Sequence, residues 1–275
     1  MTENKNEKLG WINGHWGVFK DLKVPINDRG LNFADGIFET IFILNGVPQL
    51  LNEHLNRWEE SASTLGMNPP PSKEWLISLI EDGINRSQLN NVNGVIRINW
   101  TRGASKQRGI DISKTSYHSF WLEIDSYQPN FESISTIISQ TERRNSFSRL
   151  SYCKTFSYNQ GIQARIEANN AGFNDAILLN SQGEICCATT ANILVKRGNN
   201  WLTPPSNSGC LPGIMRQRGI NLNIIKEALI EVIPKDNDEW FLINSLSCRS
   251  IQKINKKELK ISTNAKEFWL SLLKV

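Results

Sequence analysis

The chain has 275 residues, of which 39% are hydrophobic and 21% are charged, and nine are tryptophans. This composition excludes a disordered chain, and the length predicts two packed domains or one large domain. The formal charge of +4 comes from 31 basic and 27 acidic residues spread along the sequence, so we expect no nucleic-acid partner.

The first part of the chain predicts an antiparallel sheet with two amphipathic helices. Aromatic and β-branched residues alternate in the strand segments, and Asn45-Gly46 is typical of a hairpin turn. The helical segments repeat apolar residues every three or four positions, and one begins with a sequence like a capping box, SKEW. We expect strands over residues 9–19, 41–50, 95–101 and 119–124, and helices over residues 53–65 and 72–86.

Tyr127-Gln128-Pro129-Asn130 is the predicted linker, because proline blocks continuation of a strand. We therefore expect an N-terminal domain over residues 1–128 and a C-terminal domain over residues 129–275. The second domain predicts strands over residues 133–139, 176–179, 185–195 and 241–244, a helix over 157–171, and one or two helices over 212–233. This mixed order favours an α+β fold over a doubly wound sheet.

The termini and the cysteines exclude several classes of protein. The N-terminus is polar and no apolar run approaches the roughly 18 residues of a membrane span, so we expect a cytoplasmic protein without a membrane partner. Five cysteines without a CxxC pair argue against both a disulfide framework and a structural zinc site. Three widely separated histidines predict no metal site.

Two local patterns could serve a cofactor that carries an aldehyde and a phosphate. Lys154 precedes a predicted helix and could form a Schiff base, although spacing alone favours a surface lysine. In residues 211–216 (LPGIMR), proline and glycine precede a helical run, so the amides of Ile214 and Met215 would face an anion. Pro-Gly also commonly precedes helices that bind no ligand, and this alternative stays open.

Several further motifs recur along the chain: residues 28–40 (DRGLNFADGIFET), 45–46, 53–57 (EHLNR), Lys154 with its helix, 183–192 (GEICCATTAN), 203–205, 211–216 and 244–245. In their order and approximate spacing, over roughly residues 10–255, these motifs resemble the class-IV aminotransferase family of pyridoxal 5'-phosphate (PLP) enzymes. The resemblance implies a two-domain fold-type IV enzyme, similar to D-amino acid aminotransferase. It also implies a homodimer with its active site near the domain interface, acting on an amino-acid-like small molecule.

The resemblance also implies a role for each matching residue. Lys154 matches the lysine that carries PLP and moves the substrate proton, and Arg57 matches the arginine that binds the cofactor phosphate. Ile214 and Met215 would give backbone amides to the same phosphate, and Ser245 a hydroxyl. Tyr158 lies near the position of the tyrosine beside the phenolic oxygen of the cofactor.

One position departs from the family. The acidic residue that keeps the pyridine nitrogen protonated is replaced by Cys187, and a thiol stabilises a pyridinium poorly. Glu184 could replace it only if a bulge alters the register of the strand. A slower enzyme, an enzyme that needs less ring protonation, and a PLP-binding protein that has lost catalysis all remain open.

Local likenesses around residues 213–216, the Cys-Cys pair and residues 244–246 favour a 4-amino-4-deoxychorismate lyase, an enzyme of folate biosynthesis. This reaction eliminates an aromatic product and leaves pyruvate, and aromatisation helps it. The alternative is an aminotransferase acting on branched-chain or D-amino acids. Arg102 and Arg108 are the candidates for binding substrate carboxylates, although the same arginines could equally cap loop carbonyls or face water. Arg97 is expected to pair with a buried acid.

Overall fold

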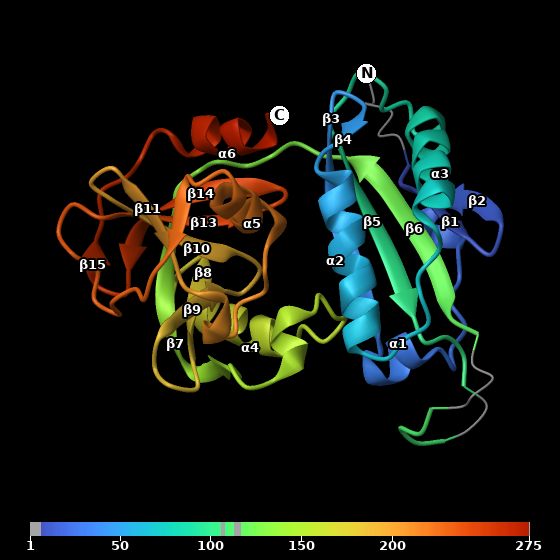
Figure 1. The fold of residues 1–275 in the computed structure, drawn as a ribbon, viewed down its shortest axis with the longest axis horizontal. Helices are drawn as coiled ribbons and strands as arrows, with labels where there is room; N and C mark the ends of the chain where they lie inside the picture. Colours follow the sequence, from blue (N-terminus) through green and yellow to red (C-terminus); the bar gives the residue numbers. More distant parts are fainter. Residues whose placement is uncertain (1–6, 106–107, 113–116, 275) are drawn as a thin grey trace. The chain divides into compact units, whose positions relative to one another are not determined.

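The structure is a computed structural model that describes residues 7–105, 108–112 and 117–274. The chain forms two compact units (Figure 1). Unit 1 contains the described residues up to Gln128 together with Cys153–Ser157, and unit 2 contains Pro129–Tyr152 and the residues from Tyr158 onward. Both units combine a sheet with helices, which confirms the α+β class.

Unit 1 is built on a six-stranded antiparallel sheet in the order β2-β1-β6-β5-β3-β4. All the strands and helices predicted for residues 9–124 are present. The strands are β1 (Leu9–Ile12), β2 (His15–Val18), β3 (Gly36–Leu44), β4 (Val47–Pro48), β5 (Gly94–Thr101) and β6 (Ser119–Ser126); the helices are α1 (Arg29–Phe33), α2 (Leu51–Thr64), α3 (Lys73–Arg86) and the 3-10 turn Phe19–Asp21.

Strand β3 is the centre of unit 1. Seven of its nine residues are buried because β5 pairs along it and α2 packs against it (Figure 1). The β3–β4 turn confirms the predicted hairpin, since Asn45 and Gly46 have φ of 47° and 83°, the left-handed values that such a turn needs. This rigid strand positions the side chains described below.

The segment Cys153–Ser157 joins unit 1 through the backbone of β3. The amide of Phe38 donates to the carbonyl of Lys154 at 3.0 Å, and the amide of Phe156 donates to the carbonyl of Gly36 at 3.0 Å. β5 occupies one edge of β3 and β4 reaches only the far end of the other, so the segment fills the remaining edge. Lys154 was predicted in the C-terminal domain, but long-range pairing with β3 places it in unit 1.

Unit 2 has a nine-stranded mixed sheet in which β12-β11-β10-β13-β14-β7-β8-β9 are neighbours and β15 pairs with β14. The strands are β7 (Ile134–Arg144), β8 (Asp175–Asn180), β9 (Ile185–Ala188), β10 (Asn192–Arg197), β11 (Asn200–Thr203), β12 (Ile225–Glu227), β13 (Glu239–Asn244), β14 (Ser247–Ile254) and β15 (Lys257–Glu258). The helices are α4 (Asn159–Asn170), α5 (Ile214–Asn221) and α6 (Ala265–Leu273), with 3-10 turns at Arg149–Tyr152 and Ser206–Ser208.

The region predicted as one or two helices over residues 212–233 contains only α5. The helix ends before Asn223, whose φ is 57°, and residues 225–227 then pair with β11 as the parallel strand β12. A partner strand decided this difference, because the apolar residues there suit either structure. Among the described residues, we find no helix with the length and apolar character that a membrane crossing requires.

Candidate functional site

Lys154 is fixed by its backbone while its side chain remains only half-buried. Its Nζ lies 4.4 Å from the centroid of the Phe38 ring, on the strand to which its backbone is bonded. An amine on a rigid backbone beside an aromatic face is well placed to react repeatedly in one geometry.

Next to Phe38 on β3, Glu39 forms a buried charged group with two residues of α2. Its Oε1 accepts from Nε of Arg57 at 2.8 Å, and its Oε2 accepts from Nη2 of Arg57 at 2.6 Å. Nδ1 of His54 is 2.7 Å from the same Oε2. Glu39 is fully buried, and His54 and Arg57 are 1% and 8% exposed. Three ionisable groups in one core cluster are costly unless paired, so this arrangement is specific.

The electrostatics of the cluster favour an ionised acid and a neutral imidazole. Burial alone would raise the pKa of Glu39, but Arg57 and His54 together lower it to about 2. Burial lowers the pKa of His54 below 6.5, against the opposing effect of Glu39, and the charges of Arg57 and Lys154 lower it further. Lys154 therefore acts electrostatically on this cluster.

Arg57 was predicted from the sequence as a site residue, but Glu39 and His54 were not. Both lie in motifs already recognised, FET and EHLNR, and His54 and Arg57 are three residues apart on a helix. That spacing was an available signal. The contact with Glu39 was not, since it requires knowing which strand α2 covers.

Arg97 on β5 is partly exposed, and it was predicted to pair with a buried acid. Its guanidinium stacks on the Phe38 ring at 3.6 Å, and Nε donates to Oδ1 of Asn99 at 2.8 Å. Its Nε also lies 4.0 Å from Oε1 of Glu123, whose side chain is 31% exposed. Arg97 and Lys154 are therefore two cations beside one aromatic ring.

Arg102 is 5% exposed, and its guanidinium is engaged by the protein itself. Nε donates to Asp35 at 2.9 Å, and the two terminal nitrogens donate to the carbonyls of Gly66 and Leu65 at 2.8 and 2.9 Å. These contacts favour a structural role over the predicted binding of a substrate carboxylate.

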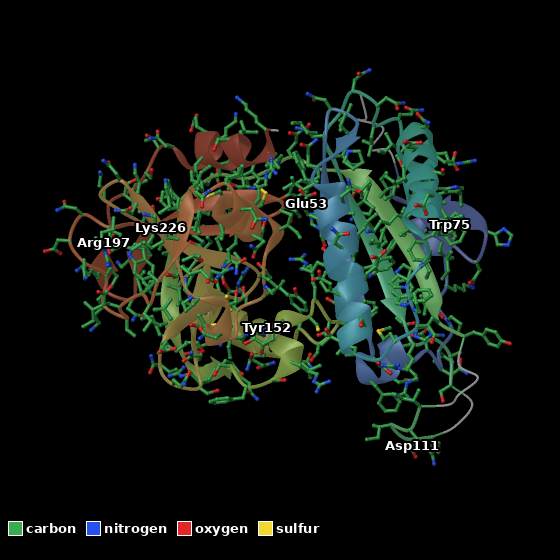
Figure 2. All side chains as sticks on the ribbon, in the orientation of Figure 1. Glu53, Trp75, Asp111, Tyr152, Arg197 and Lys226 are labelled. Atoms are coloured by element: carbon green, nitrogen blue, oxygen red, sulfur yellow. The ribbon has the colours of Figure 1, made fainter. Side chains whose placement is uncertain are left out.

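Asp35 also binds Arg29, which holds the loop that carries Arg108. Nε of Arg29 donates to Asp35 at 2.8 Å, and its terminal nitrogens donate to the carbonyls of residues 109–111 at 3.0 to 3.3 Å. Asp111, labelled in Figure 2, marks this loop. Arg108 itself is exposed, so it keeps its place as a candidate for substrate binding.

In unit 2, Cys187 lies in a buried strand with an irregular register. Leu178 faces Cys187, but Leu179 faces Ile185, so Cys186 is an extra residue in β9. Such a bulge turns neighbouring side chains toward one side. The interaction between the two adjacent thiols lowers the pKa of Cys187, against the effect of burial, and together with burial it raises the pKa of Cys186.

Glu184 does not use this bulge to replace the missing acid. Its Oε2 accepts from Nδ2 of Asn180 at 2.8 Å, and its amide donates to Oδ1 of the same residue at 2.9 Å. The side chain therefore closes the turn between β8 and β9, and the position five residues before Asn192 remains a thiol.

Hydrogen bonds of Asn192 and Asn244 connect other parts of unit 2 to the region where β9 joins β10. Nδ2 of Asn192 donates to the carbonyl of Leu211, just before α5, and Nδ2 of Asn244 donates to the carbonyl of Thr190 in the loop. Ser245 follows Asn244 in the two-residue turn between β13 and β14. The structure thus connects the turn of Ser245 and the start of α5 to one loop.

Helix α5 begins at Ile214 and has no side-chain cap at Gly213. The amides of Ile214 and Met215 belong to the first turn, where no intrahelical carbonyl can accept from them. An anion at this end would be stabilised by these donors and by the helix dipole. Tyr158, in contrast, lies at the start of α4, where its carbonyl accepts from Ile162 at 2.9 Å.

The sequence pattern described as amino-transferase class IV matches residues 36–254. The chain belongs to this family. Class-IV enzymes depend on PLP, so this chain is a PLP-dependent enzyme. The matched region contains the amine, the arginine and the uncapped helix described above.

Named relatives of this class-IV enzyme include different activities. A Methanocaldococcus jannaschii protein, provisionally assigned as a branched-chain-amino-acid aminotransferase, is 31% identical over 81% of this chain and 76% of its own length. The aminodeoxychorismate lyase of Bacillus subtilis is 22% identical over 75% of this chain and 71% of its own. The structure of a Thermoproteus uzoniensis branched-chain aminotransferase superposes with a TM-score of 0.85 and 21% identity, covering 96% and 93% of the two chains. That likeness shows the fold alone.

The residues present fit a class-IV cofactor at most positions. Unit 1 offers a half-buried amine for an aldehyde and a buried arginine for a phosphate dianion. Unit 2 separately offers an uncapped helix N-terminus, which also suits a phosphate. The thiol of Cys187 is a mismatch, because the family has a carboxylate at the matching position.

Proposed function

We propose that this class-IV enzyme is a lyase that converts 4-amino-4-deoxychorismate to p-aminobenzoate and pyruvate, a reaction of folate biosynthesis. The observation that carries the proposal is the buried thiol of Cys187, with Glu184 engaged in its own turn. PLP supplies an electron sink for the reacting carbon, and a thiol supports that sink less well than a carboxylate. Formation of an aromatic product favours elimination and compensates for a weaker sink.

Each residue then has a defined task. Lys154 holds the cofactor and accepts the proton from the substrate α-carbon at its Nζ. Arg57 binds the phosphate, together with the amides of Ile214 and Met215 and the hydroxyl of Ser245. Tyr158 lies beside the cofactor's phenolic oxygen. Arg108 binds a substrate carboxylate, and the active form is a homodimer.

The second candidate is an amino-acid aminotransferase acting on branched-chain or D-amino acids. It is supported by the 31% identity with the M. jannaschii protein, which exceeds the 22% identity with the B. subtilis lyase. The two reactions share the cofactor and the lysine, but a transaminase requires a keto-acid acceptor. A PLP-binding protein without turnover is the remaining alternative.

The products distinguish these functions. Purified protein is incubated with aminodeoxychorismate alone, and separately with amino acid and keto acid pairs. p-Aminobenzoate that appears with an equal amount of pyruvate, without an acceptor, supports the lyase. Formation of new amino acids that depends on the keto acid supports the transaminase, and the absence of both products supports a binding protein.

Cys187→Glu tests the observation on which the proposal rests. The variant restores the carboxylate, so any transamination should increase while the lyase reaction changes less. Cys187→Gln is the matched control, because it adds the same volume without the charge. A large gain of lyase activity in the glutamate variant alone would contradict the idea that elimination tolerates the thiol.

A further inference from the structure

We infer that Glu39, itself held by His54, is a positioning residue that fixes the guanidinium of Arg57 for binding a phosphate monoester dianion. This inference rests on the proposed binding of the cofactor phosphate by Arg57. It assigns functions to two buried side chains that do not themselves carry or react with the cofactor.

Contacts within the protein fix the orientation of the Arg57 guanidinium. Glu39 engages Arg57 from the Nε side, through bonds of 2.8 and 2.6 Å, and this determines the direction in which the Nη1–Nη2 end points. His54 contacts the same Oε2 at 2.7 Å, so the carboxylate is itself held in place. These three residues come from β3 and α2, which pack against each other, so the cluster is held rigidly.

The protonation of the cluster defines each donor. An ionised carboxylate only accepts hydrogen bonds, so Nδ1 of His54 must carry the proton that it shares with Glu39. Oε2 of Glu39 therefore accepts from Arg57 and His54 at once. A glutamine in its place could not reproduce this set, because its amide nitrogen is a donor and would face other donors.

Two effects of Glu39 on an anion have opposite signs. Its negative charge repels a dianion near Arg57, so removing the charge alone should strengthen phosphate binding. Its contacts orient the guanidinium, so removing them should weaken phosphate binding. The structure favours orientation as the larger effect, because Glu39 contacts Arg57 twice and is fully buried.

The test compares the affinities of the full-length protein for PLP and for pyridoxal, which lacks the phosphate. Dissociation constants come from the absorbance change on adding each compound. The dissociation constant for pyridoxal divided by that for PLP measures the contribution of the phosphate, without any measurement of turnover. Glu39→Gln and Glu39→Asp should each reduce this ratio roughly tenfold, as for other orienting partners of a ligand-binding group. Glu39→Asp keeps the charge, so a purely electrostatic role predicts no change for it.

His54 provides a conservative rescue. His54→Asn keeps a donor near the position of Nδ1 and should retain most of the preference for PLP, whereas His54→Leu removes the donor and should reduce it. Circular dichroism and thermal melting identify a temperature at which every variant is folded. The comparison of His54→Asn with His54→Leu also separates orientation from loss of packing, since both variants remove the imidazole ring.

Arg57→Gln separates the phosphate contact of Arg57 from the positioning role of Glu39. If it lowers the preference for PLP while Glu39→Gln raises it or leaves it unchanged, the positioning role is overturned and the phosphate role of Arg57 survives. If Arg57→Gln itself has no effect, both the proposed phosphate contact and the inference are wrong. A further fall caused by Glu39→Gln in the Arg57→Gln background, equal to its effect alone, also overturns the inference, because no guanidinium remains to be oriented.

Discussion

At the scale of single residues, the Glu39 cluster links the stability of the fold to pH. The pKa of Glu39 falls from its ordinary value of 4.5 to about 2 in the folded chain. Its contribution to stability is therefore present above pH 4.5 and is lost as the pH falls from 4.5 toward 2. The pKa of His54 also lies below its ordinary 6.5, so its neutral form stabilises the fold above pH 6.5 and protonation of the unfolded chain begins to oppose folding below that value.

We expect the free energy of unfolding to decrease below pH 6.5 and to decrease more steeply below pH 4.5. Urea unfolding followed by tryptophan fluorescence, at several pH values, measures this. In Glu39→Gln the steeper decrease should be smaller than in the natural chain. Glu59→Gln, at an exposed position of α2, the helix that carries His54 and Arg57, is the control and should keep the natural pH dependence. If the free energy of unfolding of Glu39→Gln depends on pH as it does in the natural chain, the cluster is not the source of the pH dependence.

A single oxygen of Asp35 holds two arginines, Arg29 and Arg102, at 2.8 and 2.9 Å. Asp35→Asn leaves two cations of low exposure without their carboxylate, so we expect a loss of about 3 kcal/mol in the free energy of unfolding. Chemical denaturation provides the measurement. Glu258→Gln, which removes the acid of an exposed ion pair, should cost less than about 1 kcal/mol. Equal losses for the two variants would contradict the central place given to Asp35.

At the scale of elements, the start of α5 depends on close packing with β10. Gly213 has φ of −64°, which any residue adopts, but a Cβ there would lie 1.9 Å from Oδ1 of Asn192. Gly213→Ala should push Asn192 from its bond to the Leu211 carbonyl and cost about 1–3 kcal/mol of stability. Thermal melting and hydrogen exchange at the amides of α5 measure the effect.

The matched background for this variant is Asn192→Ala, which removes the side chain that the new Cβ would meet. In that background, Gly213→Ala should have little further effect, because the clash is absent. A full additional loss there would mean that the glycine is needed for another reason, such as close approach of a ligand to the backbone.

At the scale of the whole molecule, binding of the cofactor should stabilise the folded chain. A ligand that binds only the native state adds about 2.7 kcal/mol at a concentration one hundred times its dissociation constant. We therefore expect the melting temperature to rise with PLP concentration and to rise less with pyridoxal. In Lys154→Ala the rise should be much reduced, and borohydride treatment should no longer attach the cofactor to the chain. An unchanged attachment in this variant would disprove the assignment of Lys154.

Local signals were sufficient for most elements of unit 1. The turn at Asn45-Gly46 and the helices from Leu51 and Lys73 follow from turn chemistry, capping and apolar spacing, which act between neighbours in sequence. Strand β12 was missed because a segment of three residues becomes a strand only when β11 pairs with it. The assignment of Lys154 to unit 1 likewise depends on β3, more than one hundred residues earlier in the chain.

By itself, the sequence determined the α+β class, the family and the cofactor, because several motifs in order are far more specific than any one of them. It also identified the departure at Cys187. Only the tertiary structure decided how charges are paired: that Arg57 is held by Glu39, that Arg102 is engaged by Asp35, and that Glu184 closes a turn. The reason is physical, since an ion pair is selected by distance in space, whereas composition and periodicity describe only neighbours along the chain.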